Sequence, residues 1–147
     1  MSDDGDFIFD TTQFLTKKAV QTFNIPLVNS GDILLSFKLT LGRVGIAQSN
    51  MVTNEAIACI KVDDEWRLYI YCFLKNYDFN SRMESTSSIG KAFNSKLLKR
   101  LEFVSPSKTQ LTDFNNKLMP LLTIMLYLYK QKRFLNNAKQ KLLQKYF

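Results

Sequence analysis

Apolar positions form short runs over the first two thirds of the chain and recur with a helical period over the last third. The run Ile33–Phe37 has the length of a buried strand, and Gly42–Ala47 and Ala56–Val62 predict two further strands. Two glycines in the second of these strands indicate a bulge or a close approach of backbone. Residues Thr12–Phe23 show helical spacing after a threonine and before Pro26, which predicts a helix.

In the middle of the chain the pattern allows more than one prediction. Val62–Glu65 is expected to be a polar turn, and the apolar run Arg67–Leu74 fits a strand or one face of a helix equally well. Ser81–Ser88 predicts a loop rich in hydroxyl groups. We expect a short helix over Lys91–Leu98 and then a strand over Arg100–Val104.

From Leu111 onward, steps of three and four residues form a heptad seam, which predicts one long helix. Pro120 is expected to kink this helix or to mark the start of its main part. We expect this seam to pack either on the chain's own domain or on a second helix. The seam consists of Leu111, Phe114, Leu118, Leu121, Met125, Leu128, Lys132, Leu135, Lys139, Leu142 and Tyr146.

A length of 147 residues allows one compact domain with an appendage, and the 46% hydrophobic content is enough for a packed core. The chain has no histidine, which excludes His-based acid–base catalysis, His-ligated metal and a Ser-His-Asp triad within it. Cys59 and Cys72 do not form a CxxC pair, so we interpret them as reduced core thiols.

The net charge of +7 is distributed unevenly. Residues 1–64 hold more acids than bases, whereas the segment from Lys130 to the end holds six bases and no acid. A basic segment of this kind favours an acidic partner such as nucleic acid or an anionic surface. The solvated face of an ordinary helix has a similar composition.

The N-terminus is acidic and has no apolar region of the kind found in a secretory signal. The longest apolar stretch, Leu118–Tyr129, is shorter than the roughly 20 residues that a membrane-spanning helix needs. We therefore expect a soluble, cytoplasmic protein.

Three stretches follow one another in a specific order. The first joins GDILLSFKLTLGRVGIA (Gly31–Ala47) and TNEAIACI (Thr53–Ile60), the second is STSSIGKAFNSKLLKRLEFVSPS (Ser85–Ser107), and the third is the helix Leu111–Phe147. Together they resemble the specificity subunits of type I restriction-modification systems. The first two stretches are similar to blocks of a target-recognition domain, and the third is similar to the spacer helix that follows such a domain.

The resemblance implies an α+β fold, with a small mixed-sheet target-recognition domain followed by a long C-terminal coiled-coil-forming helix. It places a partial recognition domain at residues 1–108 and a spacer or dimerisation helix at residues 109–147. A complete subunit of the family has two of each, so the chain looks like a C-terminal piece of one. The implied function is sequence recognition of double-stranded DNA, with no catalysis and no cofactor.

The implied partners are methyltransferase subunits docked on the helix, a nuclease subunit held indirectly, and a second copy or another half of a specificity subunit. Bases are recognised by paired hydrogen bonds and phosphates by cations and hydroxyls. The candidate DNA contacts are Lys38, Thr40, Arg43, Ser87, Ser88 and Lys91. The candidate helix interface is Leu118, Leu121, Met125, Leu128, Leu135 and Leu142.

Two other interpretations remain open at this point. In the first, the chain binds a methyltransferase or another half-subunit through its helix but does not read DNA. In the second, the basic and aromatic C-terminal segment lies on an anionic membrane surface as an amphipathic helix.

Overall fold

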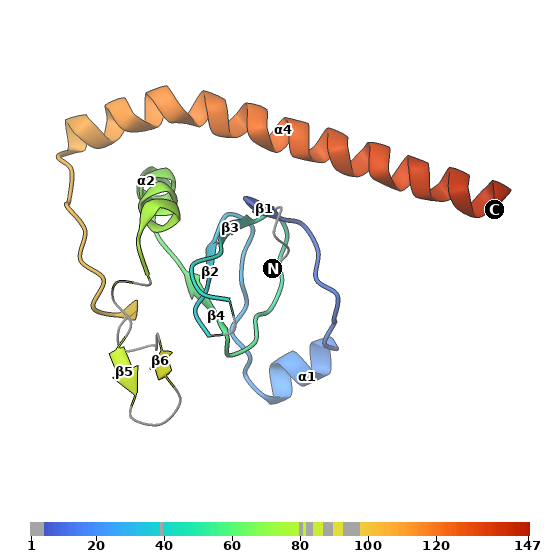
Figure 1. The fold of residues 1–147 in the computed structure, drawn as a ribbon, viewed down its shortest axis with the longest axis horizontal. Coiled ribbons are helices and arrows are strands. Elements are labelled where there is room, and N and C mark those ends of the chain that lie inside the picture. Colours follow the sequence, from blue (N-terminus) through green and yellow to red (C-terminus); the bar gives the residue numbers. More distant parts are fainter. Residues whose placement is uncertain (1–4, 39, 80, 82–83, 87–89, 93–97) are drawn as a thin grey trace.

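The computed structural model describes residues 5–38, 40–79, 81, 84–86, 90–92 and 98–147. The fold is α+β, as the sequence predicts: a small sheet, a helix packed on it, and a long C-terminal helix that extends past both (Figure 1). In chain order the elements are β1 (Phe7–Ile8), α1 (Lys17–Thr22), β2 (Ile33–Ser36), β3 (Val44–Ala47), β4 (Ile57–Ile60), α2 (Asp64–Asn76), β5 (Glu84–Thr86), β6 (Gly90–Ala92) and α4 (Lys108–Tyr146).

The main sheet has the order β1-β3-β2-β4, with β1 parallel to β3 and the other neighbours antiparallel. The three strands predicted from the apolar runs are confirmed as β2, β3 and β4. All four residues of β2 are buried, because side chains cover both faces of the sheet. Ile33 and Leu35 pack in the larger core with α2, and Leu34 packs on the opposite face with Val28 and Ala47.

A close approach of backbone explains the glycine inside β3. A Cβ atom at Gly45 would lie 2.8 Å from the carbonyl oxygen of Gly5, so no larger residue fits without a shift of the chain. The N-terminal segment therefore lies directly against β3, and this contact continues into the short parallel pairing of β1.

The run that fitted a strand or a helix is helical. Helix α2 begins after Asp63, and Asp64 and Glu65 lie in its first turn, where negative charge is favourable. The predicted polar turn is therefore wrong for these two residues. Buried positions recur with helical spacing along α2 and turn one apolar face to the sheet, with Leu68, Tyr71 and Leu74 in the larger core.

Three other predictions need correction. The first helix begins at Lys17 rather than near Thr12, because Thr16 is its N-cap and accepts the Ala19 N–H at 3.1 Å. Phe14 and Leu15 before it are exposed, so no buried face supports an earlier start. The helix predicted over Lys91–Leu98 is wrong at its start, since Lys91 and Ala92 belong to β6, and residues 93–97 lie outside the described part of the chain.

The segment predicted as a strand over Arg100–Val104 is irregular. Leu101 packs against the larger core, and the Phe103 ring meets those of Trp66, Tyr69 and Phe73 on α2, whereas Val104 is exposed. The Tyr69 hydroxyl donates to the Val104 carbonyl at 2.6 Å. A side chain thus satisfies a backbone group that a neighbouring strand would otherwise satisfy.

The long helix is confirmed, and a capping box between Ser107 and Gln110 fixes its start. It continues through Pro120 as one element. Its packed row follows Leu111, Phe114 and Leu118 of the predicted seam and then diverges to Leu122, Leu126 and Tyr129. This row has the period of a straight helix, about 3.6 residues, whereas the heptad seam has 3.5, so the two rows separate along the helix.

Replacing Leu35 by alanine should lower the free energy of unfolding by about 2–5 kcal/mol, because its side chain is completely buried between β2 and α2. The exposed Leu121→Ala serves as the matched control and should change it by no more than about 0.5 kcal/mol. Urea titration of the three proteins measures both values. Equal losses in the two variants would contradict this placement of the core.

Candidate functional site

The β2–β3 loop is held closed by the side chain of Ser36, which is buried at the end of β2. The Ser36 hydroxyl donates to the Thr40 carbonyl and accepts the Arg43 N–H at 3.3 Å. The Ser36 carbonyl accepts the Gly42 N–H at 3.0 Å. The loop therefore has its own internal hydrogen bonds, which join its two ends.

Gly42 completes this turn. Its φ of +81° lies in the left-handed region, and a Cβ atom there would come within 3.0 Å of the Phe79 ring. A side chain at this position would meet both backbone strain and a packed ring. The sequence analysis places this glycine in a strand, as part of a bulge or a close approach of backbone; the structure places it in the turn before β3, against the Phe79 ring.

The structure brings three of the six candidate DNA contacts together in this loop. Lys38 and Thr40 are exposed at its tip, and Arg43 is half-buried where the chain enters β3. Lys91 lies in β6, opposite Ser85, in a separate two-stranded sheet. Ser87 and Ser88 lie outside the described residues.

The candidate helix interface divides into two parts. Leu118 packs against the chain's own core. The other five candidates are exposed: Leu121, Met125, Leu128, Leu135 and Leu142. Tyr127 and Phe134 are exposed beside them, 61% and 68% respectively, although the heptad pattern did not select them. The first half of α4 thus uses one apolar row internally and leaves a second row open.

The second half of α4 carries the positive charge. From Lys130 to Lys145 its bases outnumber its acids six to none. Arg133 is the one that contacts the domain, through an ion pair with Asp10 and a position 4.7 Å from the centre of the Phe9 ring. Beyond Arg133 the side chains are exposed except for Ala138, which is half-buried, so helix α4 leaves the domain there (Figure 1).

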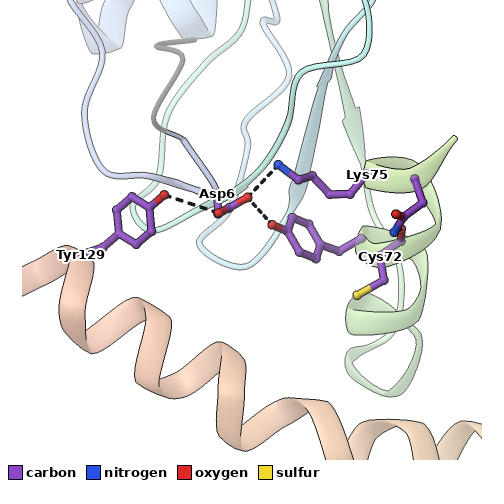
Figure 2. Close-up of polar contacts among 6 residues, drawn as sticks. Asp6, Cys72, Lys75 and Tyr129 are labelled. Carbon is purple, nitrogen blue, oxygen red and sulfur yellow. Dashed lines mark hydrogen bonds and ion pairs between the residues drawn. The ribbon is translucent and has the colours of Figure 1, made fainter. Parts of the chain in front are cut away.

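Asp6 joins three segments that are distant in sequence. Figure 2 shows its carboxylate between Tyr129 of α4 and Lys75 of α2. It accepts the Tyr71 hydroxyl at 2.6 Å and the Tyr129 hydroxyl at 3.4 Å, and it pairs with the Lys75 ammonium at 2.8 Å. The sequence gives no motif for this cluster, because its members are separated by up to 123 residues.

The cluster shifts the pKa of its members in opposite directions. Burial acts to raise the pKa of Asp6, but the hydrogen bonds from Lys75 and Tyr71 and the charge of Lys75 together hold it below its ordinary value. Burial and the bond to Asp6 raise the pKa of Tyr71. Tyr71 thus remains a protonated donor at neutral pH.

A cavity of about 730 Å³ opens between the N-terminal segment, residues 51–54 and α4. Its walls are mostly apolar, with Lys132, Arg133 and Asn136 on the helix side. A second cavity of about 380 Å³ lies beside α2 and is lined mainly by apolar residues such as Trp66, Phe73 and Phe103. Among the described residues that line the two cavities, no nucleophilic side chain is paired with a base.

The two cysteines are unreactive by environment. Burial, with the Asp32 carboxylate nearby, raises the pKa of Cys59 to about 11, and burial raises that of Cys72. Among the described residues, no three His, Cys, Asp or Glu side chains are placed to hold a metal ion. A search of the same residues finds no helix with the length and hydropathy of a membrane span.

No protein-family model matches the chain, and no curated protein sequence matches it either.

Asp6→Asn should lower the free energy of unfolding at pH 7 by about 1–2 kcal/mol, since hydrogen bonds to a charged group are lost and Lys75 is partly exposed. The folded-state pKa of Asp6 lies below the unfolded value of about 3.9. Its stabilisation is therefore complete above about pH 5 and lost as the pH falls through the folded-state pKa.

Urea titrations from pH 7 to pH 3 test this dependence. The difference between the native chain and Asp6→Asn should shrink toward acid pH. Tyr71→Phe should cost more than Tyr129→Phe, because its bond to Asp6 is the shorter. A pH-independent difference would show that the carboxylate charge has no role.

Proposed function

We propose that the chain is a non-catalytic DNA-recognition component of a type I restriction-modification assembly. In this proposal the β2–β3 loop contacts double-stranded DNA, and the exposed row of α4 binds methyltransferase subunits in the cytoplasm. The nuclease subunit is then held indirectly. The observation that carries the proposal is helix α4, which leaves its own domain with an open apolar row and a segment whose charged residues are all basic.

The open row supports an assembly role. Leu128, Leu135 and Leu142 repeat every seven residues, and each is more than half exposed. An apolar stripe of this kind is costly to leave in water and is typical of a surface that another helix covers. The chain's own domain covers only the neighbouring row, through Leu122 and Leu126.

The β2–β3 loop supports the DNA-contacting role. Lys38 offers an ammonium and Thr40 a hydroxyl at an exposed tip, and both groups bind phosphate oxygens. Arg43 offers a planar guanidinium, whose two parallel donors match the acceptors of guanine in the major groove. The hydrogen bonds of Ser36 hold Thr40 and Arg43 close to one another on this loop.

A second candidate function is an interaction protein that binds the same partners without reading DNA. The exposed apolar side chains of α4 favour it, because they form a contact surface that needs no DNA. Both candidate functions use helix α4, but only DNA recognition uses the β2–β3 loop. Variants of the loop therefore distinguish the two functions.

The DNA role is tested by mixing the chain with its methyltransferase subunit and selecting bound duplexes from a randomised library at two salt concentrations. Selection of one sequence that persists at the higher salt is the expected result, because contacts to phosphate alone weaken steeply with salt. Arg43→Ala should reduce the preference for that sequence by about 1–3 kcal/mol. Lys38→Ala should weaken all duplexes alike and lower the salt slope by about one.

Lys17→Ala is the control for charge, since Lys17 is exposed in α1, away from the loop. Binding of the methyltransferase without any selected sequence would support the interaction protein instead. If the chain neither binds the methyltransferase nor selects a DNA sequence, the proposal is wrong.

The assembly role predicts that Leu128→Asp with Leu135→Asp abolishes capture of the methyltransferase subunit in a pull-down, because each change buries a charge in the contact. The unfolding free energy should stay within about 0.5 kcal/mol for each, since both side chains are exposed. Asn137→Asp with Gln144→Asp adds the same charge at exposed polar positions on the opposite side of the helix and should leave capture intact. Equal losses in both pairs would indicate an effect of charge alone.

A further inference from the structure

The exposed side of α4 alternates apolar and basic side chains along its second half. Steps of four and three residues keep six side chains on one side of the helix, because such steps follow the helical period. None of the six belongs to the row that packs on the domain. All are exposed, and we call them the distal stripe: Leu128, Lys132, Leu135, Lys139, Leu142 and Tyr146.

The two lysines of the distal stripe have no counter-charge within this chain. In the part of the chain that the structure describes, neither Lys132 nor Lys139 makes an ion pair or a hydrogen bond. The sequence of α4 holds one acidic residue, Asp113, which lies in the first half of the helix and pairs with Lys117 at 2.7 Å. The distal stripe therefore presents two positive charges between apolar side chains.

This charge pattern disfavours a second copy of the chain as the partner. In a parallel pair of helices, Lys132 would face Lys132 of the other copy and Lys139 would face Lys139, and these like charges repel one another. In an antiparallel pair, each α4 offers only Asp113, which already has a partner. Neither direction neutralises the lysines.

Nucleic acid and membrane surfaces also fit the distal stripe less well. Phosphates would neutralise the lysines but would leave the leucines beside them uncovered. A helix that lies on an anionic membrane carries its cations on its polar face. Here Lys132 and Lys139 lie within the apolar stripe instead. A helix that carries carboxylates between apolar residues satisfies both the charges and the leucines.

We infer that the distal stripe binds an amphipathic helix with acidic side chains opposite Lys132 and Lys139. The apolar residues of this partner helix cover Leu128, Leu135 and Leu142. Its carboxylates pair with the two ammonium groups, whose aliphatic stems pack in the same contact. The inference rests on the assembly role proposed for α4 and states the chemistry of the surface that a methyltransferase subunit presents to it.

Two synthetic peptides test the charge preference directly. Both have the sequence of residues 121–147, with all six bases replaced by glutamate in one peptide and by glutamine in the other. By fluorescence anisotropy, the full-length chain should bind the glutamate peptide at least about tenfold more tightly than the glutamine peptide. Added salt should reduce this ratio, because exposed charges are screened.

Two pairs of substitutions in the chain locate the preference. Lys132→Glu with Lys139→Glu should weaken binding of the glutamate peptide at least about tenfold, because it sets like charges opposite one another. Lys130→Glu with Lys141→Glu makes the same change of net charge at exposed positions on another side of the helix. This control should weaken binding by no more than about threefold, because those charges are not in the contact.

Four results would overturn the inference. The first two are a lack of preference for the glutamate peptide and equal losses in the two pairs of variants. The third is a dimer of the native chain, seen by sedimentation, that Leu135→Asp dissociates, because it assigns the distal stripe to a second copy. The fourth is binding of duplex DNA or of anionic phospholipid vesicles, but of neither peptide, that is lost in Lys132→Glu with Lys139→Glu.

The peptide experiment also separates this inference from the proposed function. If the chain prefers the glutamate peptide but does not capture the methyltransferase subunit, the assembly role is wrong and the inference stands. If the chain captures the subunit but does not discriminate between the peptides, the inference alone is wrong.

Discussion

The arrangement of the molecule depends most on the hydrogen bonds and the ion pair of the Asp6 carboxylate. It lies at the start of the sheet, and Tyr71 and Lys75 of α2 and Tyr129 of α4 all reach it. The Asp6 carboxylate thereby links the face of α2 that packs on the sheet to the position at which α4 packs. Since Arg133 follows Tyr129 by about one helical turn and binds Asp10, the N-terminal segment holds α4 at two successive points.

This attachment determines which surfaces are available for partners. Because α4 packs through Leu122, Leu126 and Tyr129, the row of Leu121, Leu128 and Leu135 must face outward. The hydrogen bonds of Ser36 hold the ends of the β2–β3 loop without any contact to α4. The loop and the exposed row of α4 are therefore two separate surfaces of one small domain.

The sequence pattern predicted the strands and helices that are determined by local interactions. The apolar runs identified β2, β3 and β4, and the period of α4 was visible because it extends over ten turns. The pattern did not show which of two adjacent rows packs inward, since residues such as Leu121 and Leu122 are equally apolar and tertiary contact decides between them. The segment ending at Val104 was predicted as a strand because its composition suits one, yet a tyrosine hydroxyl replaces the ladder. The Asp6 cluster had no local signal.

In the last turns of α4 the side chains are exposed, and those that are charged carry charges of only one sign. An isolated helical segment of this length is marginal in water, and repulsion among Lys139, Lys141 and Lys145 weakens it further at low salt. Whatever binds this segment, whether a nucleic acid or a helix with acidic side chains, also supplies the charge that its helix lacks. The free energy of binding a partner is therefore the free energy of the contacts minus the free energy that is needed to complete the helix. Part of the affinity thus depends on folding, and the structure of the bound complex does not show that part.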